Sequence, residues 1–324
     1  MAVTLGNSTV VTVYGGSGFL GRYVVQHLAR AGCRIRVAVR RPDLAGFLQP
    51  LGSVGQIVAV QANIRDAASV RRAAEGADAV VNLVGILQPQ GRQNFHSVHV
   101  EGPSFIAAAA RDMGARALVH VSAIGADRTS RSVYARSKGE GETEVLKAYP
   151  RAVILRPSLV FGPEDQFFNR FAAMARIAPV LPLIGGKTRF QPVYVGDVAR
   201  AVVAALSGRA SPGKSYELGG PRIYTFREIY DLITEWTMRD RPYIPIPFWA
   251  AKLQGLFLQY LPGAPLTLDQ VRLLQRDNIV SAEAIRDAAT IEALGITPQS
   301  VESVVPEYLK RFRPKGEFSN GTAA

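Results

Sequence analysis

Cysteine is almost absent from this sequence, and histidine is scarce. Cys33 is the only cysteine among the 324 residues, so the chain cannot form an internal disulfide. None of the histidines stands at a spacing typical of a zinc site; they are His27, His96, His99 and His120. We therefore expect neither a disulfide scaffold nor a bound metal ion.

Long apolar runs are missing as well. The most apolar stretch, residues 243–261, is interrupted by prolines, a lysine and glutamines, whereas a helix that crosses a bilayer needs roughly 20 mainly apolar residues. The opening residues, MAVTLGNSTV, have no basic segment followed by an apolar one, which is the pattern of a secretory signal. These features predict no membrane-spanning helix and no targeting peptide.

Acidic residues are outnumbered by basic ones. The chain has 38 Lys and Arg against 26 Asp and Glu, for a net charge of +12. Such a surplus attracts anions, among them nucleotides, acidic lipid head groups, acidic protein surfaces and nucleic acids. No nucleic-acid recognition motif accompanies the basic residues, so we do not expect nucleic acid to be a partner.

In residues 1–160 short β-branched runs alternate with longer helical patterns. Runs that are apolar on both faces and separated by helices are typical of a parallel sheet covered on both sides. We expect strands at Val10–Tyr14, Arg34–Val39, Gln56–Gln61, Ala79–Val84, Ala117–Val121 and Ala152–Leu155. We expect helices at Leu20–Ala31, Ala67–Glu75, Gly102–Met113 and Tyr134–Ala148. The pattern predicts an α/β protein with a doubly wound, Rossmann-type domain.

The regular alternation fades after Phe161, where prolines become frequent. We expect residues 161–313 to form a smaller, mainly helical lobe that closes the cleft, with residues 189–220 contributing to the first domain. Two apolar stripes at helical spacing belong to this part of the chain; they are Phe226, Ile229, Tyr230 and Ile233, and Ile285, Ala289 and Ala293. Residues 314–324 are polar and predict a flexible tail.

A glycine pattern separates the first strand from the first helix. The run VVTVYGGSGFLGRYVV contains Gly15, Gly18 and Gly21, with Phe19 and Leu20 between the last two at the expected start of the helix. Glycines at such a turn let the backbone approach a pyrophosphate, which then lies at the positive end of the helix. A plain strand-to-helix turn is the alternative interpretation, but the flanking elements favour dinucleotide binding.

Two arginines follow the second strand, where an NAD-binding domain places an acid for the ribose hydroxyls. This chain has Arg40 and Arg41 there. A guanidinium group pairs with a 2′-phosphate through parallel hydrogen bonds, whereas an acid repels it. The residues therefore predict NADP(H), unless both are simply surface arginines.

Two further turns follow the third and fourth strands. The first is Asn63-Ile64-Arg65-Asp66, which could hold the adenine through Asn63 and Ile64. The second is Asn82-Leu83-Val84-Gly85, where Val84 and Gly85 could let the backbone pass beside the ribose. Strand ends of an open α/β sheet are where such ligands bind. Each pair, taken alone, is also an ordinary turn.

Ser122 ends the fifth strand, and Tyr134 and Lys138 follow on the next helix. The spacing of four residues puts the phenol and the ammonium on one helical face. An adjacent ammonium favours a phenolate, which would bring the pKa of the tyrosine down toward the range useful for proton transfer. Ser122 could polarise a carbonyl beside this pair.

These motifs, in this order, resemble the short-chain dehydrogenase/reductase superfamily in its extended form, which includes nucleotide-sugar epimerases and dehydratases. The resemblance runs from Val10 to about Leu218 and includes RPS at 156–158 and QPVYVGDV at 191–198. It implies that Tyr134, Lys138 and Ser122 form the catalytic set. It also implies that the cofactor-binding residues include Gly15, Gly18, Phe19, Leu20, Gly21, Tyr134, Lys138, Pro157 and Ser158.

Two positions depart from that family pattern. Extended members often carry an asparagine in the helix after the fourth strand, where this chain has His99, and a Ser/Thr pair where it has Ser122-Ala123. His99 could serve by hydrogen bonding or be merely structural. These departures bear on turnover more than on binding.

A closer resemblance lies in YARSKGEGE, RPSLVFGPEDQFFNRF, FQPVYVGDVA and LGITPQSVESVVPEYL. These segments are similar to the reductase-like accessory subunits of respiratory complex I and to bacterial proteins like them. The resemblance implies tightly held NADPH, a structural or assembly role, complex I subunits as partners, and a peripheral position on the cytoplasmic side of the inner membrane. The alternative is an active NAD(P)-dependent oxidoreductase or epimerase acting on a carbonyl or a nucleotide sugar.

Residues 248–260 predict a helix that is apolar around most of its circumference. It is either a buried core helix or a surface that docks on a membrane or on a membrane-bound partner. Basic residues near the C-terminus favour contact with an acidic lipid surface; they are Lys310, Arg311, Arg313 and Lys315.

Overall fold

The computed structural model describes residues 3–259 and 266–316 and divides into two compact units. Unit 1 contains the chain up to Pro157 together with Val195–Leu218 and Val280–Thr297. Unit 2 contains Ser158–Tyr194, Gly219–Ile279 and the residues from Pro298 onward.

Unit 1 is built on a seven-stranded sheet in which every neighbouring pair of strands is parallel. From one edge to the other its strands are β11 (Ser215–Leu218), β6 (Val153–Pro157), β5 (Ala117–Val121), β4 (Ala79–Asn82), β1 (Val10–Tyr14), β2 (Arg34–Val39) and β3 (Ile57–Gln61). The expected parallel Rossmann-type sheet is thereby confirmed. Its chain order reverses beside β1, and ligands of open α/β sheets bind at such a switch point.

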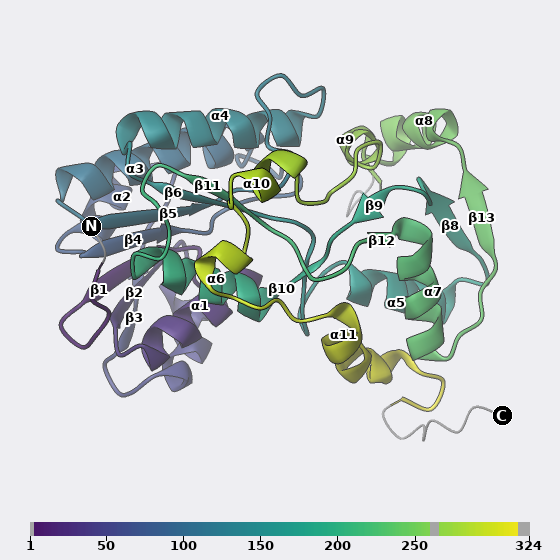
Figure 1. Ribbon diagram of the computed structural model, residues 1–324, viewed down its shortest axis with the longest axis horizontal. Coiled ribbons are helices and arrows are strands. Elements are labelled where there is room, and N and C mark those ends of the chain that lie inside the picture. The colour runs from purple at the N-terminus through teal and green to yellow at the C-terminus, as the bar shows by residue number, and fades with distance from the viewer. Residues whose placement is uncertain (1–2, 260–265, 317–324) are drawn as a thin grey trace. The chain divides into compact units, whose positions relative to one another are not determined.

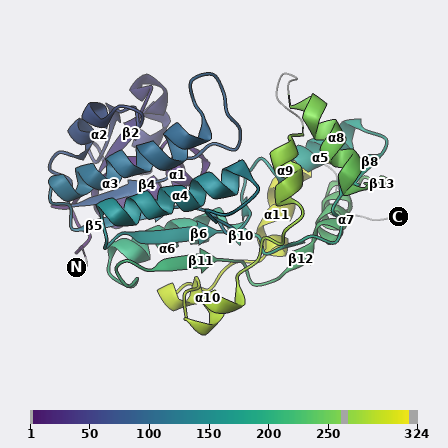
Figure 2. The same ribbon diagram turned by 90° about the horizontal axis from the view of Figure 1, so that it is seen from above.

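Helices cover both faces of this sheet (Figure 1). One face carries α2 (Ala67–Ala74), α3 (Gly102–Asp112) and α4 (Val133–Ala148), and the other carries α1 (Phe19–Arg30) and α6 (Val195–Leu206). Seen from above, α3 and α4 run side by side (Figure 2). Shorter helical segments of this unit are 3-10 turns at Pro42–Leu51 and Glu292–Leu294, a π-helical turn at Ser97–Glu101 and α10 (Ala282–Arg286).

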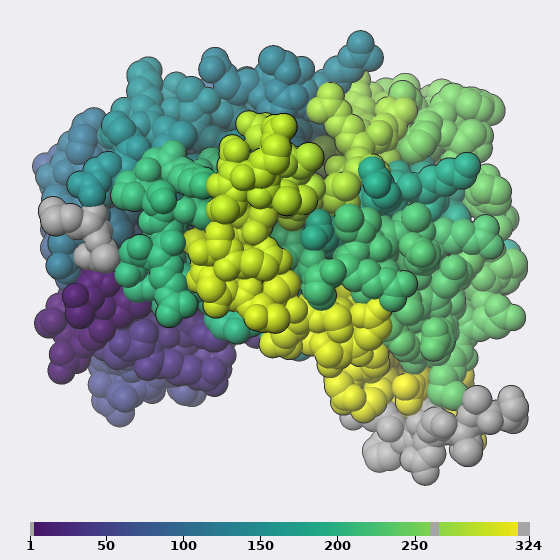
Figure 3. Space-filling view, in the orientation of Figure 1, coloured from purple at the N-terminus to yellow at the C-terminus, as the bar shows by residue number. Residues whose placement is uncertain are grey.

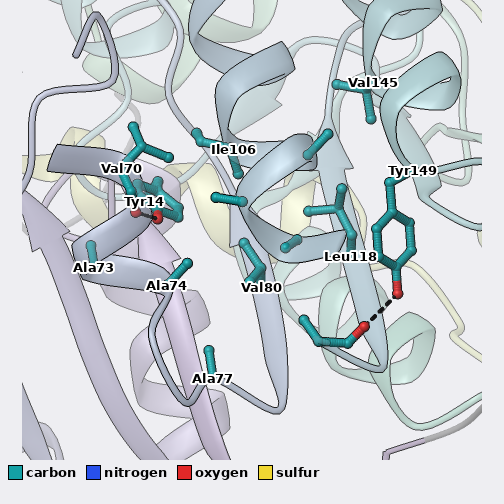
Figure 4. Close-up of a cluster of buried hydrophobic side chains, with 14 of the residues drawn as sticks. Tyr14, Val70, Ala73, Ala74, Ala77, Val80, Ile106, Leu118, Val145 and Tyr149 are labelled. Atoms are coloured by element: carbon teal, nitrogen blue, oxygen red, sulfur yellow. Dashed lines mark hydrogen bonds between the residues drawn. The ribbon is translucent and has the colours of Figure 1, made fainter. Parts of the chain in front are cut away.

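The core between the sheet and α2, α3 and α4 is made largely of alanine and valine, with two buried tyrosines (Figure 4). The hydroxyl of Tyr14 donates to the Val70 carbonyl at 2.7 Å, and that of Tyr149 donates to the Ala115 carbonyl at 2.8 Å. Each buried hydroxyl therefore has a partner, as a buried polar group requires. Small side chains let the helices approach the sheet closely.

Unit 2 is mainly helical, as expected for the C-terminal part of the chain. Its helices are α5 (Phe168–Ile177), α7 (Phe226–Thr237), α8 (Phe248–Leu258), α9 (Leu268–Leu273) and α11 (Val301–Leu309), followed by a 3-10 turn at Lys310–Phe312. Short strand pairs join β7 (Val160–Phe161) with β10 (Val193–Tyr194), β9 (Arg189–Phe190) with β12 (Tyr224–Thr225), and β8 (Leu181–Ile184) with β13 (Tyr243–Ile246). The stripe predicted at Phe226–Ile233 is buried in the aromatic core of this unit.

The second predicted stripe is wrong. Helix α10 ends at Arg286, and Ala288 takes a left-handed backbone conformation with φ 46°, which an L-residue rarely continues into a helix. Ile285 is consequently 63% exposed, while Ala289 is buried. The left-handed conformation at Ala288 ends the helix, so the apolar spacing of Ile285, Ala289 and Ala293 does not form one helical face.

Candidate functional site

The turn after β1 is shaped by glycines that have different tasks. Gly15 has φ +81°, a conformation that glycine adopts without strain. A Cβ on Gly21 would lie 2.6 Å from the backbone of Gly16, whereas a Cβ on Gly18 would meet only the Gly15 carbonyl oxygen, at 3.3 Å. Gly21 is therefore needed for packing within the fold, and Gly18 leaves open space in front of the helix.

Helix α1 begins directly behind this open space. Gly18 is its N-cap, no side chain caps it, and its first turn, which opens with Phe19 and Leu20, carries no acid. The positive end of the helix is thus presented without a competing negative charge. A phosphate group suits such a place.

The ends of β1 and β4 come together at the predicted cofactor residues. A Cβ on Gly15 would lie 3.1 Å from a Val84 methyl group, so the two turns are in direct contact. Asn82 fixes the second turn, because its Oδ1 accepts from the Val84 N–H at 3.1 Å and its Nδ2 donates to His120 Nδ1 at 3.0 Å. The sequence pointed to Asn82 only as the start of this turn and did not point to His120, because their contact depends on the pairing of β4 with β5.

Gly85 lies against the predicted catalytic set. A Cβ at this position would be 3.5 Å from Lys138 Nζ and 3.6 Å from His99 Nε2. Lys138 is 5% exposed and donates to the Val121 carbonyl oxygen at 3.3 Å. The structure thus brings Gly15, Val84, Gly85 and Lys138 together at the carboxyl ends of the central strands.

Ser122 directly follows β5, at the same end of the sheet. Its side chain is 4% exposed, and its Oγ is buried without a hydrogen-bond partner among the residues that the structure describes. A buried hydroxyl normally has a partner. Ser122 therefore has capacity for a hydrogen bond to a bound molecule.

Burial, and not the neighbouring ammonium, dominates the titration of Tyr134 and Lys138. Removal from water raises the pKa of Tyr134 to about 12 and lowers the pKa of Lys138 to about 8, which Glu142 partly opposes. The expectation that Lys138 brings the pKa of Tyr134 down is therefore wrong for the protein without a ligand. Desolvation disfavours both charged forms, so the phenol stays protonated at neutral pH.

His99, at the position where the family often has asparagine, is buried within the π-helical turn and uses both ring nitrogens. Its Nε2 accepts from the Ile86 N–H at 3.0 Å, so Nδ1 carries the proton and donates to Ser137 Oγ at 2.9 Å. Ser137 in turn donates to the Tyr134 carbonyl at 2.8 Å. Burial and Lys138 lower the pKa of His99 to about 2, so it is a neutral link that holds the start of α4.

The two arginines after β2 are not equivalent. Arg41 forms a bidentate salt bridge with Asp43, with 2.8 Å between Nη2 and Oδ2 and 3.1 Å between Nε and Oδ1. Arg40 instead lines a hollow of about 310 Å³ beyond the ends of β2 and β3. The structure therefore assigns only Arg40 to an open surface that can receive a ligand.

Asn63 and Ile64 form the turn after β3 beside this hollow. The Asn63 N–H donates to Ser69 Oγ at 3.0 Å, and its Oδ1 accepts from the Arg65 N–H at 3.2 Å. Ile64 packs closely against Gly102 and the core. The hollow also includes Arg72 on α2, which the sequence did not single out.

Pro157 and Ser158 fall into different units. Pro157 ends β6 in unit 1, where its carbonyl accepts from the Ile124 N–H at 3.0 Å. Ser158 belongs to unit 2, and its hydroxyl lies 2.7 Å from Asn278 Oδ1 and 2.9 Å from the Asn278 carbonyl oxygen. Within unit 2, Ser158 is therefore engaged by Asn278.

Two absences concern residues 3–259 and 266–316. Within them no group of His, Cys, Asp and Glu side chains is arranged to hold a metal ion. None of the helices in this part of the chain has the length and apolar character needed to cross a bilayer.

Comparison with known proteins gives three findings. Residues 11–219 match the sequence profile of the NAD dependent epimerase/dehydratase family. The chain is 35% identical to NADH dehydrogenase (ubiquinone) 1 alpha subcomplex subunit 9, a mitochondrial protein of Arabidopsis thaliana, over 97% of this chain and 81% of the relative. It is also 35% identical to the ceramide reductase of Caulobacter vibrioides, over 60% of each chain.

Among solved structures, the NADPH complex of the quinone oxidoreductase QOR2 from Escherichia coli is similar, with a TM-score of 0.72. The match covers 92% of this chain and 99% of that one at 20% identity. At that identity the likeness shows the fold alone.

Proposed function

Because this chain belongs to the NAD dependent epimerase/dehydratase family, we propose that it binds NADPH and serves as a largely non-catalytic, peripheral accessory subunit of respiratory complex I. The observation that carries the proposal is similarity along almost the whole chain to an alpha subcomplex subunit of NADH dehydrogenase (ubiquinone). Its partners are then other subunits of that complex, on the cytoplasmic side of the inner membrane.

The residues of unit 1 fit a dinucleotide. Gly18 leaves space at the positive end of α1 for the pyrophosphate, and Gly85 leaves space beside the Lys138 ammonium for the ribose. Lys138 and Ser122 both have hydrogen-bonding capacity that the described residues do not use up. Arg40 replaces the acid that would select NAD, so the bound form is NADPH.

In this proposal, helix α8 of unit 2 makes the contact with the membrane or with a membrane-bound partner. We define the α8 face as Trp249, Leu253, Leu256 and Phe257, which are 73%, 53%, 44% and 70% exposed. Helix α8 lies on the outside of its unit (Figure 3). The prediction of an apolar helix is confirmed for Phe248–Leu258, whereas Tyr260 lies outside the described residues. Exposed apolar clusters of this kind mark interaction surfaces.

Charge reversal on the α8 face tests the proposed assembly. The double variant Leu256→Glu/Phe257→Glu is expected to leave the membrane fraction and to stop co-migrating with NADH dehydrogenase activity on a native gel, because each charge would have to be buried in the contact. NADPH affinity should stay unchanged, since the cofactor residues belong to unit 1. The matched control is Ile177→Glu/Ile285→Glu, which alters apolar residues elsewhere that are 79% and 63% exposed.

Two outcomes would contradict the proposal. If the native protein runs apart from NADH dehydrogenase activity in mildly solubilised membranes, it is not a subunit of that complex. If the α8 double variant unfolds while the control stays folded, the α8 face is part of the core.

An active carbonyl reductase is the second candidate, and one observation favours it. Ser122 and Lys138 lie at the ends of the central strands, and the Tyr134 ring packs against His99 with 5.5 Å between the ring centroids. The high pKa of Tyr134 keeps its phenol protonated. A protonated phenol can donate to the oxygen of a carbonyl that is being reduced. NADPH, when bound, would supply the hydride for such a reduction.

Replacing Tyr134 by phenylalanine separates the two candidates. For an accessory subunit, Tyr134→Phe should keep NADPH bound with a loss of about 0.5–1.5 kcal/mol, the usual contribution of one hydrogen bond, and should leave the complex assembled. Titration calorimetry and native gels measure both. A carbonyl-reductase activity that is present in the native protein and absent from the variant would establish the enzyme instead.

A further inference from the structure

The arginines around the ends of β2 and β3 differ in whether their guanidinium groups are already engaged. Arg36 donates to the Ala73 and Glu75 carbonyls, and Arg65 donates to Asn63 Oδ1 and the Arg92 carbonyl. Arg41 pairs with Asp43 at 2.8 Å, and on α2 Arg71 lies 3.7 Å from Asp112. These four therefore have partners within the protein.

Arg40 and Arg72 are the exceptions. The described residues form no hydrogen bond or ion pair with either guanidinium group. Both arginines line the same hollow of about 310 Å³. Arg40 reaches it from the end of β2, and Arg72 reaches it from the second turn of α2. Two uncompensated positive charges around one hollow attract an anion with more than one negative charge.

The remaining lining suits a nucleoside. Gln61 and Asn63 supply amide groups, which can bond the edge of a base. The one acid in the lining, Asp66, caps α2, with its Oδ1 accepting from the Ala68 N–H at 3.0 Å. Its charge is partly offset by the positive end of that helix, so it does not cancel the two arginines.

We infer that Arg72, together with Arg40, pairs with the 2′-phosphate of the adenosine and so determines the preference for NADPH over NADH, whereas Arg41 does not. The inference rests on the proposed function, because it specifies how the same cofactor site reads the nucleotide. It differs from the sequence-based expectation, which assigned the phosphate to Arg40 and Arg41. The paired contact of Arg41 with Asp43 is what removes Arg41 from that role.

The test is titration calorimetry of the full chain with NADPH and, separately, with NADH. Arg72→Gln is expected to weaken NADPH about tenfold, as loss of a charge-assisted contact does, and to leave NADH affinity unchanged. Arg40→Gln should do the same, and the double variant should bind the two cofactors equally. The matched controls Arg71→Gln and Arg41→Gln remove a guanidinium next to each site and should keep the native preference.

The outcomes distinguish failure of this inference from failure of the proposed function on which it rests. If Arg72→Gln retains the native ratio of affinities while the native protein prefers NADPH, Arg72 has no such role and the proposed function stands. If Arg41→Gln abolishes the preference instead, the assignment of the two arginines is overturned. If the native protein binds neither cofactor, the proposed function fails together with the inference.

Discussion

Replacing Lys138 by methionine is expected to stabilise the ligand-free protein at neutral pH. The folded protein holds this ammonium in a buried place that lowers its pKa from 10.5 to about 8. Because the unfolded chain keeps the ordinary pKa, burial of the charge disfavours folding at every pH below about 8. A shift of this size corresponds to about 3 kcal/mol of destabilisation. Loss of the hydrogen bond to the Val121 carbonyl reduces the expected gain by about 1 kcal/mol.

The same shift fixes how stability depends on pH. As the pH rises from about 8 to 10.5, the folded protein has released the proton of Lys138 while the unfolded chain still binds it. Stability therefore increases across this range in the native protein, by linkage. Lys138→Met should lack that increase. Denaturant unfolding at a series of pH values measures both effects.

A matched control and a second readout make the result specific. Lys147 lies on the same helix but is exposed, so Lys147→Met should change stability little. With NADPH present the order should reverse, because the native ammonium then gains hydrogen bonds to the ribose that methionine cannot form. A Lys138→Met protein that is less stable than the native one without ligand would show that the ammonium is already well compensated.

Lys138 also illustrates what the sequence could and could not predict about the site. Its position on α4, four residues after Tyr134, follows from helical spacing, and Ser122 and the glycine turn follow from the ends of strands. Local patterns of this kind were sufficient to place the strands of residues 1–160 within a few residues. The titration of Lys138 was not predictable in that way, because it depends on how deeply the finished fold buries it.

Contacts that form only in the finished fold account for the rest. The partner of Arg41 is two residues away, but whether the pair forms depends on the backbone after β2. His99 links Ile86 with Ser137, and Arg72 meets Arg40 at one hollow. No periodicity records such pairings. The sequence pattern also does not predict that Val280–Thr297 belongs to unit 1. There the Ser281 N–H donates to Glu217 Oε2 at 2.7 Å.

The glycines of the first turn should separate stability from binding. Gly21→Ala is expected to lower the free energy of unfolding by about 3 kcal/mol, because its methyl group would overlap the backbone at Gly15 and Gly16 and a packed backbone cannot yield cheaply. Gly18→Val should lower the ligand-free stability much less, since φ −75° and ψ −179° suit a β-branched residue and a Cβ would meet only the Gly15 carbonyl oxygen, at 3.3 Å.

Addition of NADPH should then reveal the opposite ranking. At about 100 times its Kd, a ligand that binds only the folded state stabilises it by about 2.7 kcal/mol. The native protein should show this gain in thermal melts, and Gly21→Ala should show part of it wherever it is folded. Gly18→Val should show none, because the branched side chain occupies the space needed by the pyrophosphate. A Gly18→Val melting curve that still rises with NADPH would place the phosphate away from α1, and the dinucleotide would then have to enter the sheet edge by another route.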